Sequence, residues 1–99
     1  MAVGDVVSNI TSVATTATLD VRPGAGVEWV IHTLYIDSAA PSVDLQFFDG
    51  TNTLTWISAQ TGPMALSNLA LHVTNSIYVR MKNNDASSRL LGYDGVITK

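Results

Sequence analysis

Cysteine is absent from this sequence, and charged residues of both signs are scarce. Of the 99 residues, 13% are charged and 46% are hydrophobic. The absence of cysteine excludes disulfide bonds and thiolate zinc sites. The two histidines, His32 and His72, lie far apart in the sequence, and nothing beside either suggests a third ligand for a metal. Each is better explained as a packed or interfacial residue than as a pH switch, and we expect neither a metal nor a cofactor.

Residues for acid–base or nucleophilic catalysis are equally scarce. The sequence has one glutamate, Glu28, and its aspartates lie in or beside turns except for Asp20 and Asp44. A carboxyl group that acts as a general acid near neutral pH needs an apolar environment to raise its pKa. No aspartate lies in an apolar run, and no Ser–His–Asp arrangement is evident. We predict that the protein is not an enzyme.

The charge balance and the short apolar runs argue against two classes of partner. The net charge is −3, with only five lysines and arginines, whereas nucleic-acid binding needs a basic face. No apolar run approaches the roughly 18 residues that span a bilayer. Residues 1–5 lack the basic and apolar regions of a signal peptide. We therefore expect no nucleic-acid partner, no membrane partner, and synthesis in a cytoplasm.

Short alternating segments of Val, Ile, Leu, Thr and Tyr occupy most of the chain, separated by turn-forming residues. This pattern predicts an all-β fold, a single antiparallel β-sandwich or jelly-roll-like domain of about seven or eight strands over residues 1–99. The clearest turn signal is DGTN at residues 49–52, which predicts a hairpin. The predicted strands cover residues 17–21, 27–37, 43–48, 53–57, 69–74, 77–82 and 90–98, after a loosely alternating first stretch.

The segment 27–37 gives the strongest strand signal, and apolar residues on both of its faces predict a central strand. Regular alternation divides its residues into two faces: Val27, Trp29, Ile31 and Tyr35 on one, and Val30, His32, Leu34 and Ile36 on the other.

Several connections can also be assigned from residue type. Residues 38–42 form a break, and residues 58–68 form a long connection in which 63–66 would make at most one helical turn. The NS pair at 75–76 predicts a hairpin turn. Gly92 and Gly95, inside the last predicted strand, indicate a bulge or a close approach of another backbone.

The small size of the domain predicts association between copies. A single core of this size is marginally stable, and neither disulfides nor a metal can supplement it. The sequence is also rich in apolar residues for a small monomer. We therefore expect a homo-oligomer in which partner chains cover part of the apolar surface.

Candidate interface residues come from two parts of the chain. Phe47 and Phe48 are adjacent, so only one of them can face the core of a regular strand. Aromatic and arginine side chains are enriched at interface hot spots, which favours Phe48, Trp56, Tyr78 and Arg80. Residues 1–16 are predicted to form an N-terminal arm that adds a strand to a neighbouring sheet. Its candidate contact residues are Val3, Val6, Val7 and Ile10.

Three runs of residues carry a resemblance to a known class of proteins: MAVGDVV at 1–7, TNSIYVR at 74–80 and LGYDGV at 91–96. They resemble small accessory virion proteins of tailed bacteriophages, most of all the decoration or cement proteins of the head, over about a third of the chain. The resemblance implies a β-sandwich subunit, often a trimer, that binds the major capsid protein and stabilises the assembled head. It places the protein on the capsid surface of a virion made in a bacterial cytoplasm.

Two alternatives remain open at this stage. Small tail or fibre-associated proteins share the same features, so the position on the particle is not fixed. Exposed aromatic residues also serve as platforms for sugar rings, and Asp44, Gln46 and Asn52 would supply polar groups for a carbohydrate or receptor-binding module. The run at 49–52 has oxygen ligands at close spacing, but it lacks the remainder of a calcium loop and is better explained as a turn.

Overall fold

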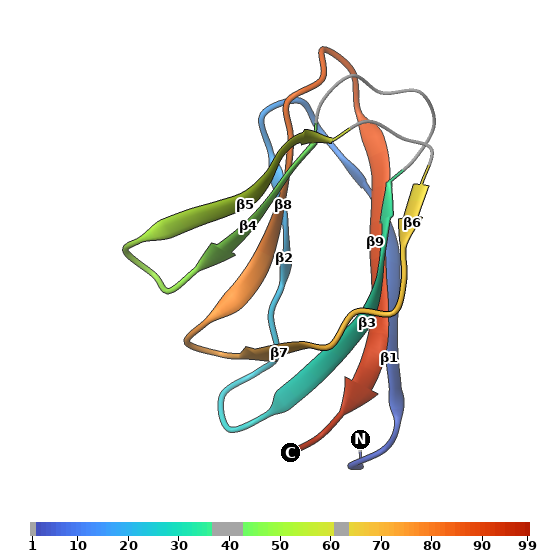
Figure 1. The fold of residues 1–99 in the computed structure, drawn as a ribbon, viewed down its shortest axis with the longest axis vertical. Coiled ribbons are helices and arrows are strands. Elements are labelled where there is room, and N and C mark those ends of the chain that lie inside the picture. Colours follow the sequence, from blue (N-terminus) through green and yellow to red (C-terminus); the bar gives the residue numbers. More distant parts are fainter. Residues whose placement is uncertain (1, 37–42, 61–63) are drawn as a thin grey trace.

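The computed structural model describes residues 2–36, 43–60 and 64–99 and contains two antiparallel sheets packed face to face (Figure 1). The first, the β9 sheet, has the order β1 (Val6–Val13), β9 (Arg89–Ile97), β3 (Glu28–Ile36), with both β6 (Met64–Leu66) and β7 (Leu71–Thr74) on the far side of β3. The second, the β8 sheet, has the order β2 (Thr18–Val21), β8 (Tyr78–Asn83), β4 (Val43–Phe48), β5 (Thr53–Gln60). The predicted all-β sandwich is confirmed, with nine strands in the described part of the chain.

The strand order follows from one long antiparallel hairpin that is rolled up. Its tip is the turn between β4 and β5, and pairing continues from there to both ends of the chain. Representative pairs are Phe48 with Thr53, Trp29 with Val73, Leu19 with Met81, and Val6 with Val96. Rolling then brings β9 beside β3 and β8 beside β4. Two sheets built in this way form a jelly roll.

Residues 49–52 form the tight turn that the sequence predicts. The Asp49 carboxylate accepts hydrogen bonds from the backbone N–H of Thr51 at 2.9 Å and of Asn52 at 2.6 Å. These bonds lower the pKa of Asp49 below its usual value. Gly50 takes a φ of 95°, a conformation that costs glycine little. The carboxylate is therefore occupied in holding the turn.

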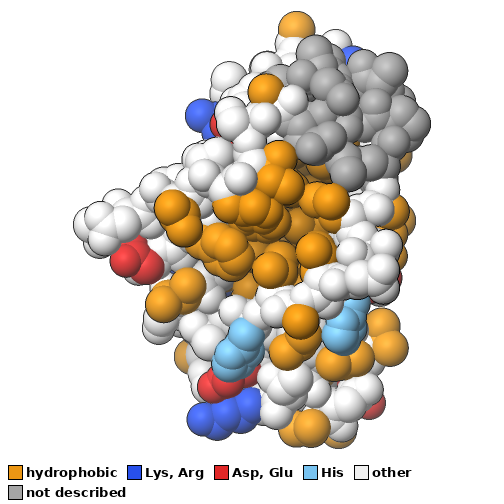
Figure 2. All heavy atoms as spheres, viewed as in Figure 1, with side chains coloured by type: hydrophobic (Ala, Val, Ile, Leu, Met, Phe, Trp, Pro, Cys, Tyr) orange, Lys and Arg blue, Asp and Glu red, His pale blue; other side chains and the backbone are white. Residues whose placement is uncertain are grey.

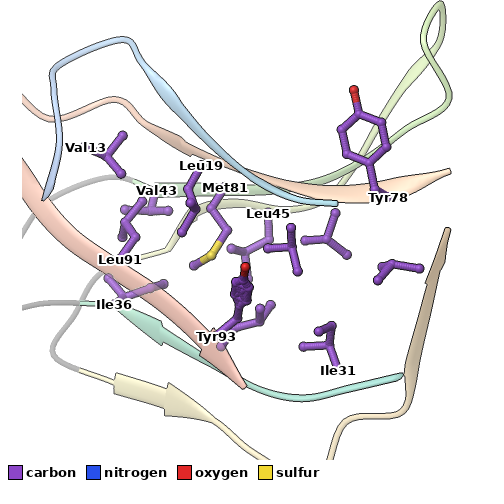
Figure 3. Close-up of a cluster of buried hydrophobic side chains, with 14 of the residues drawn as sticks. Val13, Leu19, Ile31, Ile36, Val43, Leu45, Tyr78, Met81, Leu91 and Tyr93 are labelled. Carbon is purple, nitrogen blue, oxygen red and sulfur yellow. The ribbon is translucent and has the colours of Figure 1, made fainter. Parts of the chain in front are cut away.

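The core lies between the sheets and takes its buried side chains from β1, β2, β3, β4, β7, β8 and β9, whereas β5 adds only the partly buried Trp56 and Ile57. In β4, Val43 and Leu45 are fully buried, as their alternation predicts. Figure 3 shows side chains from the two sheets meeting in this layer. The buried residues that the figure labels in this layer include Val13, Leu19, Ile31, Ile36, Val43, Leu45, Met81, Leu91 and Tyr93.

The central strand β3 contains a bulge that the sequence pattern does not reveal. Ile31 pairs with Gly95 and Thr33 with Asp94, so His32 is an extra residue in the ladder. A bulge shifts the alternation by one residue. Ile31 and Leu34 consequently face the core together, and the predicted assignment of faces beyond His32 is wrong. Tyr35, predicted on the face of Ile31, lies on the opposite side of the sheet.

Glycine at two positions of β9 allows neighbouring backbones to approach closely. A Cβ atom on Gly95 would lie 2.2 Å from the Val30 carbonyl oxygen and 2.9 Å from the Ile31 Cα. A Cβ atom on Gly92 would lie 2.5 Å from the Asn9 carbonyl oxygen. The predicted close approach at both glycines is confirmed, and Gly95 faces the bulge in β3.

A buried polar cluster joins the β1–β2 and β8–β9 connections. The Asn83 amide nitrogen donates to the carbonyl oxygens of Val13 and Ser87, both at 2.9 Å, and its amide oxygen accepts from the Asp85 N–H at 2.9 Å. Asn83 is fully buried. Asp85 accepts a hydrogen bond from Arg89, which lowers the pKa of Asp85 below its usual value. This cluster fixes the end of the sandwich at which β1 ends.

Two predictions about connections need correction. Residues 64–66 form strand β6 rather than a helical turn, because they pair with β3. The turn after Thr74 is not a hairpin within one sheet, since β7 belongs to the β9 sheet and β8 to the β8 sheet. The Thr74 N–H does donate to the Ile77 carbonyl oxygen at 2.8 Å. The predicted break at 38–42 and residue 63 lie outside the described residues.

The predicted N-terminal arm is also corrected. Residues 6–13 form β1, which pairs with β9 through eight consecutive residues from Val6–Val96 to Val13–Arg89. Two of its side chains, Val7 and Val13, belong to the core. This part of the segment is an edge strand of its own domain, because the burial of Val7 and Val13 fixes which face of the strand points to the core.

We predict that Gly95→Ala destabilises the domain by about 3 kcal/mol or more, because the added methyl group meets backbone atoms that cannot rotate away. The matched control is Gly24→Ala, where an added Cβ meets nothing within 4 Å. Urea unfolding of both variants measures the difference. Equal stability of the two variants would contradict the close approach.

We predict that Asn83→Ala lowers the free energy of unfolding by about 3 kcal/mol, because it leaves buried backbone groups without partners. The neighbouring exposed residue Asn84 supplies the control, and Asn84→Ala should change stability by less than about 0.5 kcal/mol. Chemical denaturation measures both. A small effect of Asn83→Ala on the free energy of unfolding would show that water takes over the hydrogen bonds of the Asn83 side-chain amide.

Candidate functional site

No cluster of three or more His, Asp or Glu side chains suited to hold a metal occurs among the described residues. The two histidines have separate neighbours. The His32 Nδ1 lies 3.1 Å from the Leu69 carbonyl oxygen, and the His72 Nε2 lies 2.7 Å from the Glu28 Oε1. Among the residues that the structure describes, no helix is long and apolar enough to cross a membrane.

The predicted interface residues do not form one patch. Val3, Val6 and Ile10 are strongly exposed, at 69%, 70% and 67%, on and beside the edge strand β1. Val7, predicted with them, is a core residue because it alternates with Val6 in β1. Phe48, Tyr78, Arg80 and Trp56 all lie in the β8 sheet.

The outer face of the β9 sheet exposes apolar side chains from β1 and β9. On this face, side chains of laterally paired residues form rows that run across β1, β9 and β3. Val6, Val96 and Val30 form one row, and Ile10, Gly92 and Tyr35 form another. Leu90, which is 46% exposed, extends this surface next to the second row. We call the surface of Val6, Ile10, Val30, Tyr35, Leu90 and Val96 the β9 face.

A polar pair lies in the middle of the β9 face. The Tyr35 hydroxyl donates a hydrogen bond to the Asp94 carboxylate. This bond, together with partial burial, raises the pKa of Tyr35 above its usual value. Ser8 pairs with Asp94 across β1 and β9. An open hollow of about 640 Å³ adjoins these groups, and its lining includes Ser8, Ile10, Tyr35 and Asp94.

Three of the predicted residues of the β8 sheet form a stacked row with Arg22 on its outer side: Phe48, Tyr78 and Arg80. The Arg80 guanidinium lies 4.0 Å from the Phe48 ring centroid, and the Arg22 guanidinium lies 4.6 Å from that of Tyr78. Phe48 and Tyr78 contact each other edge to face at 5.8 Å. Arg80 also pairs with Asp20 at 3.0 Å.

This row buries Tyr78 to 4% exposure, so the prediction of a surface-exposed Tyr78 is wrong. The outward direction of the residue was predicted correctly, and Figure 3 shows its hydroxyl pointing away from the core cluster. Arg22 and Phe48 cover the ring, and both come from other strands or connections. Phe48 and Arg80 remain half-buried.

A third apolar area lies where the two sheets separate. Figure 2 shows hydrophobic side chains gathered over the opening between the β4–β5 hairpin and strands β6 and β7. Trp56 of β5 packs on Phe47 of β4 with ring centroids 4.9 Å apart. Beside them, the side chains of Leu54 and Ile77 line a groove of about 360 Å³ at the hairpin tip.

The polar residues proposed for a sugar site are engaged within the β8 sheet or its turn. The Asp44 carboxylate accepts from the Ala59 N–H at 2.9 Å, and the Gln46 amide contacts Thr55 at 3.3 Å. Asn52 belongs to the turn with Asp49. The structure instead brings together Tyr35, Asp94 and Ser8, which sequence reasoning missed because the bulge at His32 determines where Tyr35 points.

No protein-family model matches the chain, and no curated protein matches it.

The Tyr35–Asp94 pair predicts a specific alkaline response. A raised pKa means that the pair stabilises the folded protein below the usual tyrosine pKa of 10.0, and this contribution is lost as pH rises through the folded-state pKa. Tyr35→Phe and Asp94→Asn should each show a shallower loss of thermal stability above about pH 10. Burial also raises the pKa of Tyr93, so part of the alkaline loss of stability should remain in both variants. An unchanged alkaline slope in both variants would refute the assignment.

Proposed function

We propose that this protein is a structural component of a tailed-phage virion, a decoration protein that self-associates and binds the assembled head. The observation that carries the proposal is the apolar β9 face, with Val6, Ile10 and Leu90 left exposed on a small domain. Jelly rolls serve as capsid and lectin domains. Exposed apolar patches of this kind mark surfaces that bind other proteins.

Two of the runs that carry the phage resemblance lie in the strands that form the β9 face. The runs at 1–7 and 91–96 meet in the β1–β9 pair, where Val6 pairs with Val96 and Val7 with Gly95. They contribute Val6 and Val96 to the β9 face. The resemblance implies the major capsid protein as the partner and a trimer as the assembly.

The mechanism of such a protein is burial of apolar surface between neighbouring subunits. A standard interface buries about 1,600 Å² in total, and only part of the gain remains after the cost of association. Many equivalent contacts over a shell would together resist expansion of the head. No covalent chemistry is required.

The test is the location and copy number of the protein on particles. We expect density-gradient-purified virions of the phage that encodes the chain to contain it in numbers comparable to the major capsid protein. Purified protein should also bind empty heads. A copy number of a few per particle would assign it to the tail, and a gene outside any phage or prophage gene cluster would overturn the proposal.

A second candidate function is carbohydrate or receptor binding, favoured by the hollow beside Tyr35 and Asp94. An aromatic ring, a carboxylate and a serine hydroxyl are groups that contact sugars. A glycan array with purified protein, and with Asp94→Asn as the control, tests this. Binding that the substitution abolishes would favour the second function, and an array without hits would remove it.

A further inference from the structure

The edge strand β1 presents the most regular open sheet edge of the described structure. It pairs with β9 over all eight of its residues without a register shift. It contains no charged residue, no proline and no glycine. Natural sheets usually protect an edge with charges, proline or bulges, and β1 has none of these.

The backbone groups at this edge can be assigned to particular residues. The Asp5 carbonyl oxygen accepts a hydrogen bond from the Ile97 N–H at 3.0 Å. In an antiparallel ladder, alternate residues bond to the same neighbour. The odd-numbered residues of β1 therefore face β9. Val6, Ser8, Ile10 and Ser12 direct their N–H and C=O groups to the open edge.

The other described edges are less suited to pairing. Strand β5 is as long as β1, but its pairing with β4 shifts register twice, and Ala59 takes a positive φ of 55°. Strand β2 has four residues and contains Asp20, which is paired with Arg80. Strand β6 has three residues. Bulged and short edges resist strand addition.

We infer that β1 pairs antiparallel with β1 of a second copy about a twofold axis through Ile10, so that the two β9 sheets become one continuous sheet. The inference rests on the proposed self-association and names the surface that performs it. An uncharged strand meets its own copy without like-charge repulsion, which favours a second copy as the occupant of this edge.

The register follows from two conditions. Because the open-edge groups belong to even-numbered residues, the twofold axis must pass through a residue and not between two residues. Centring on Ile10 places apolar residues opposite apolar ones and polar residues opposite polar ones. The opposed pairs are Ile10 with Ile10, Ser8 with Ser12, Asn9 with Thr11, and Val7 with Val13. Centring on Asn9 would place Ile10 opposite Ser8 and Val6 opposite Ser12.

This arrangement has a consequence for the assembly. It relates two copies through identical surfaces, so it predicts a dimer in solution in place of the trimer that the resemblance implies. It also joins the two β9 faces side by side and brings the two strongly exposed Ile10 side chains into contact with each other. The joined face remains available to a larger partner.

Cysteine cross-linking tests the register, because the natural chain has no cysteine. Directly opposed residues have Cα atoms within disulfide range. Ile10→Cys should therefore form a covalent dimer rapidly under mild oxidation. Asn9→Cys should cross-link at least tenfold more slowly, and Thr55→Cys on the β5 edge should behave like Asn9→Cys. Preferential cross-linking at Asn9 or Thr55 would overturn the inference.

Sedimentation velocity tests the association itself. Ile10→Lys places two like charges opposite each other and should give a folded monomer, verified by circular dichroism. Leu54→Lys, at a residue of similar exposure on the β5 edge, should remain dimeric. A trimeric wild type, or an oligomeric Ile10→Lys, would overturn the inference while leaving head binding to be measured separately. A dimer that fails to bind heads would instead overturn the proposed function alone.

Discussion

The antiparallel register that begins at the Asp49–Asn52 turn governs the architecture from the centre of the chain to both ends. Each strand of the first half pairs with a strand of the second half, from Phe48–Thr53 at the turn to Val6–Val96 at the termini. Most contacts therefore join distant residues, which favours slow folding. Once the long hairpin is rolled, β1 is the last strand of its sheet and keeps one open edge.

One irregularity connects the core to the outer surface. The extra residue at His32 turns Leu34 toward the core and Tyr35 toward the outside. Tyr35 then reaches Asp94, which lies on the neighbouring strand next to Gly95. Gly95 allows the two backbones to approach at the same point. The packing of the interior and the polar pair on the β9 face thus depend on one bulge and one glycine.

A smaller part of the candidate surface could be predicted from individual residues, and the remainder could not. Val6 and Ile10 were expected at an interface and are exposed, whereas Val7 and Tyr78 are buried. The burial of Tyr78 depends on Arg22, which is distant in sequence and stacks on its ring. Sequence alternation shows which side of a strand a residue occupies, but not which side chain from elsewhere covers it.

Local sequence patterns were enough to predict the all-β class, the turn at 49–52, the alternation of β4 and the close approach at the two glycines of β9, because each of these depends on local backbone preferences or on a period of two. Other features became evident only in the tertiary structure. These are the pairing of both β6 and β7 with β3, the crossing between sheets after Thr74, the place of residues 6–13 in their own sheet, and the direction of Tyr35. These features depend on which strands become neighbours when the hairpin rolls, and that choice is made by packing between residues far apart in the chain.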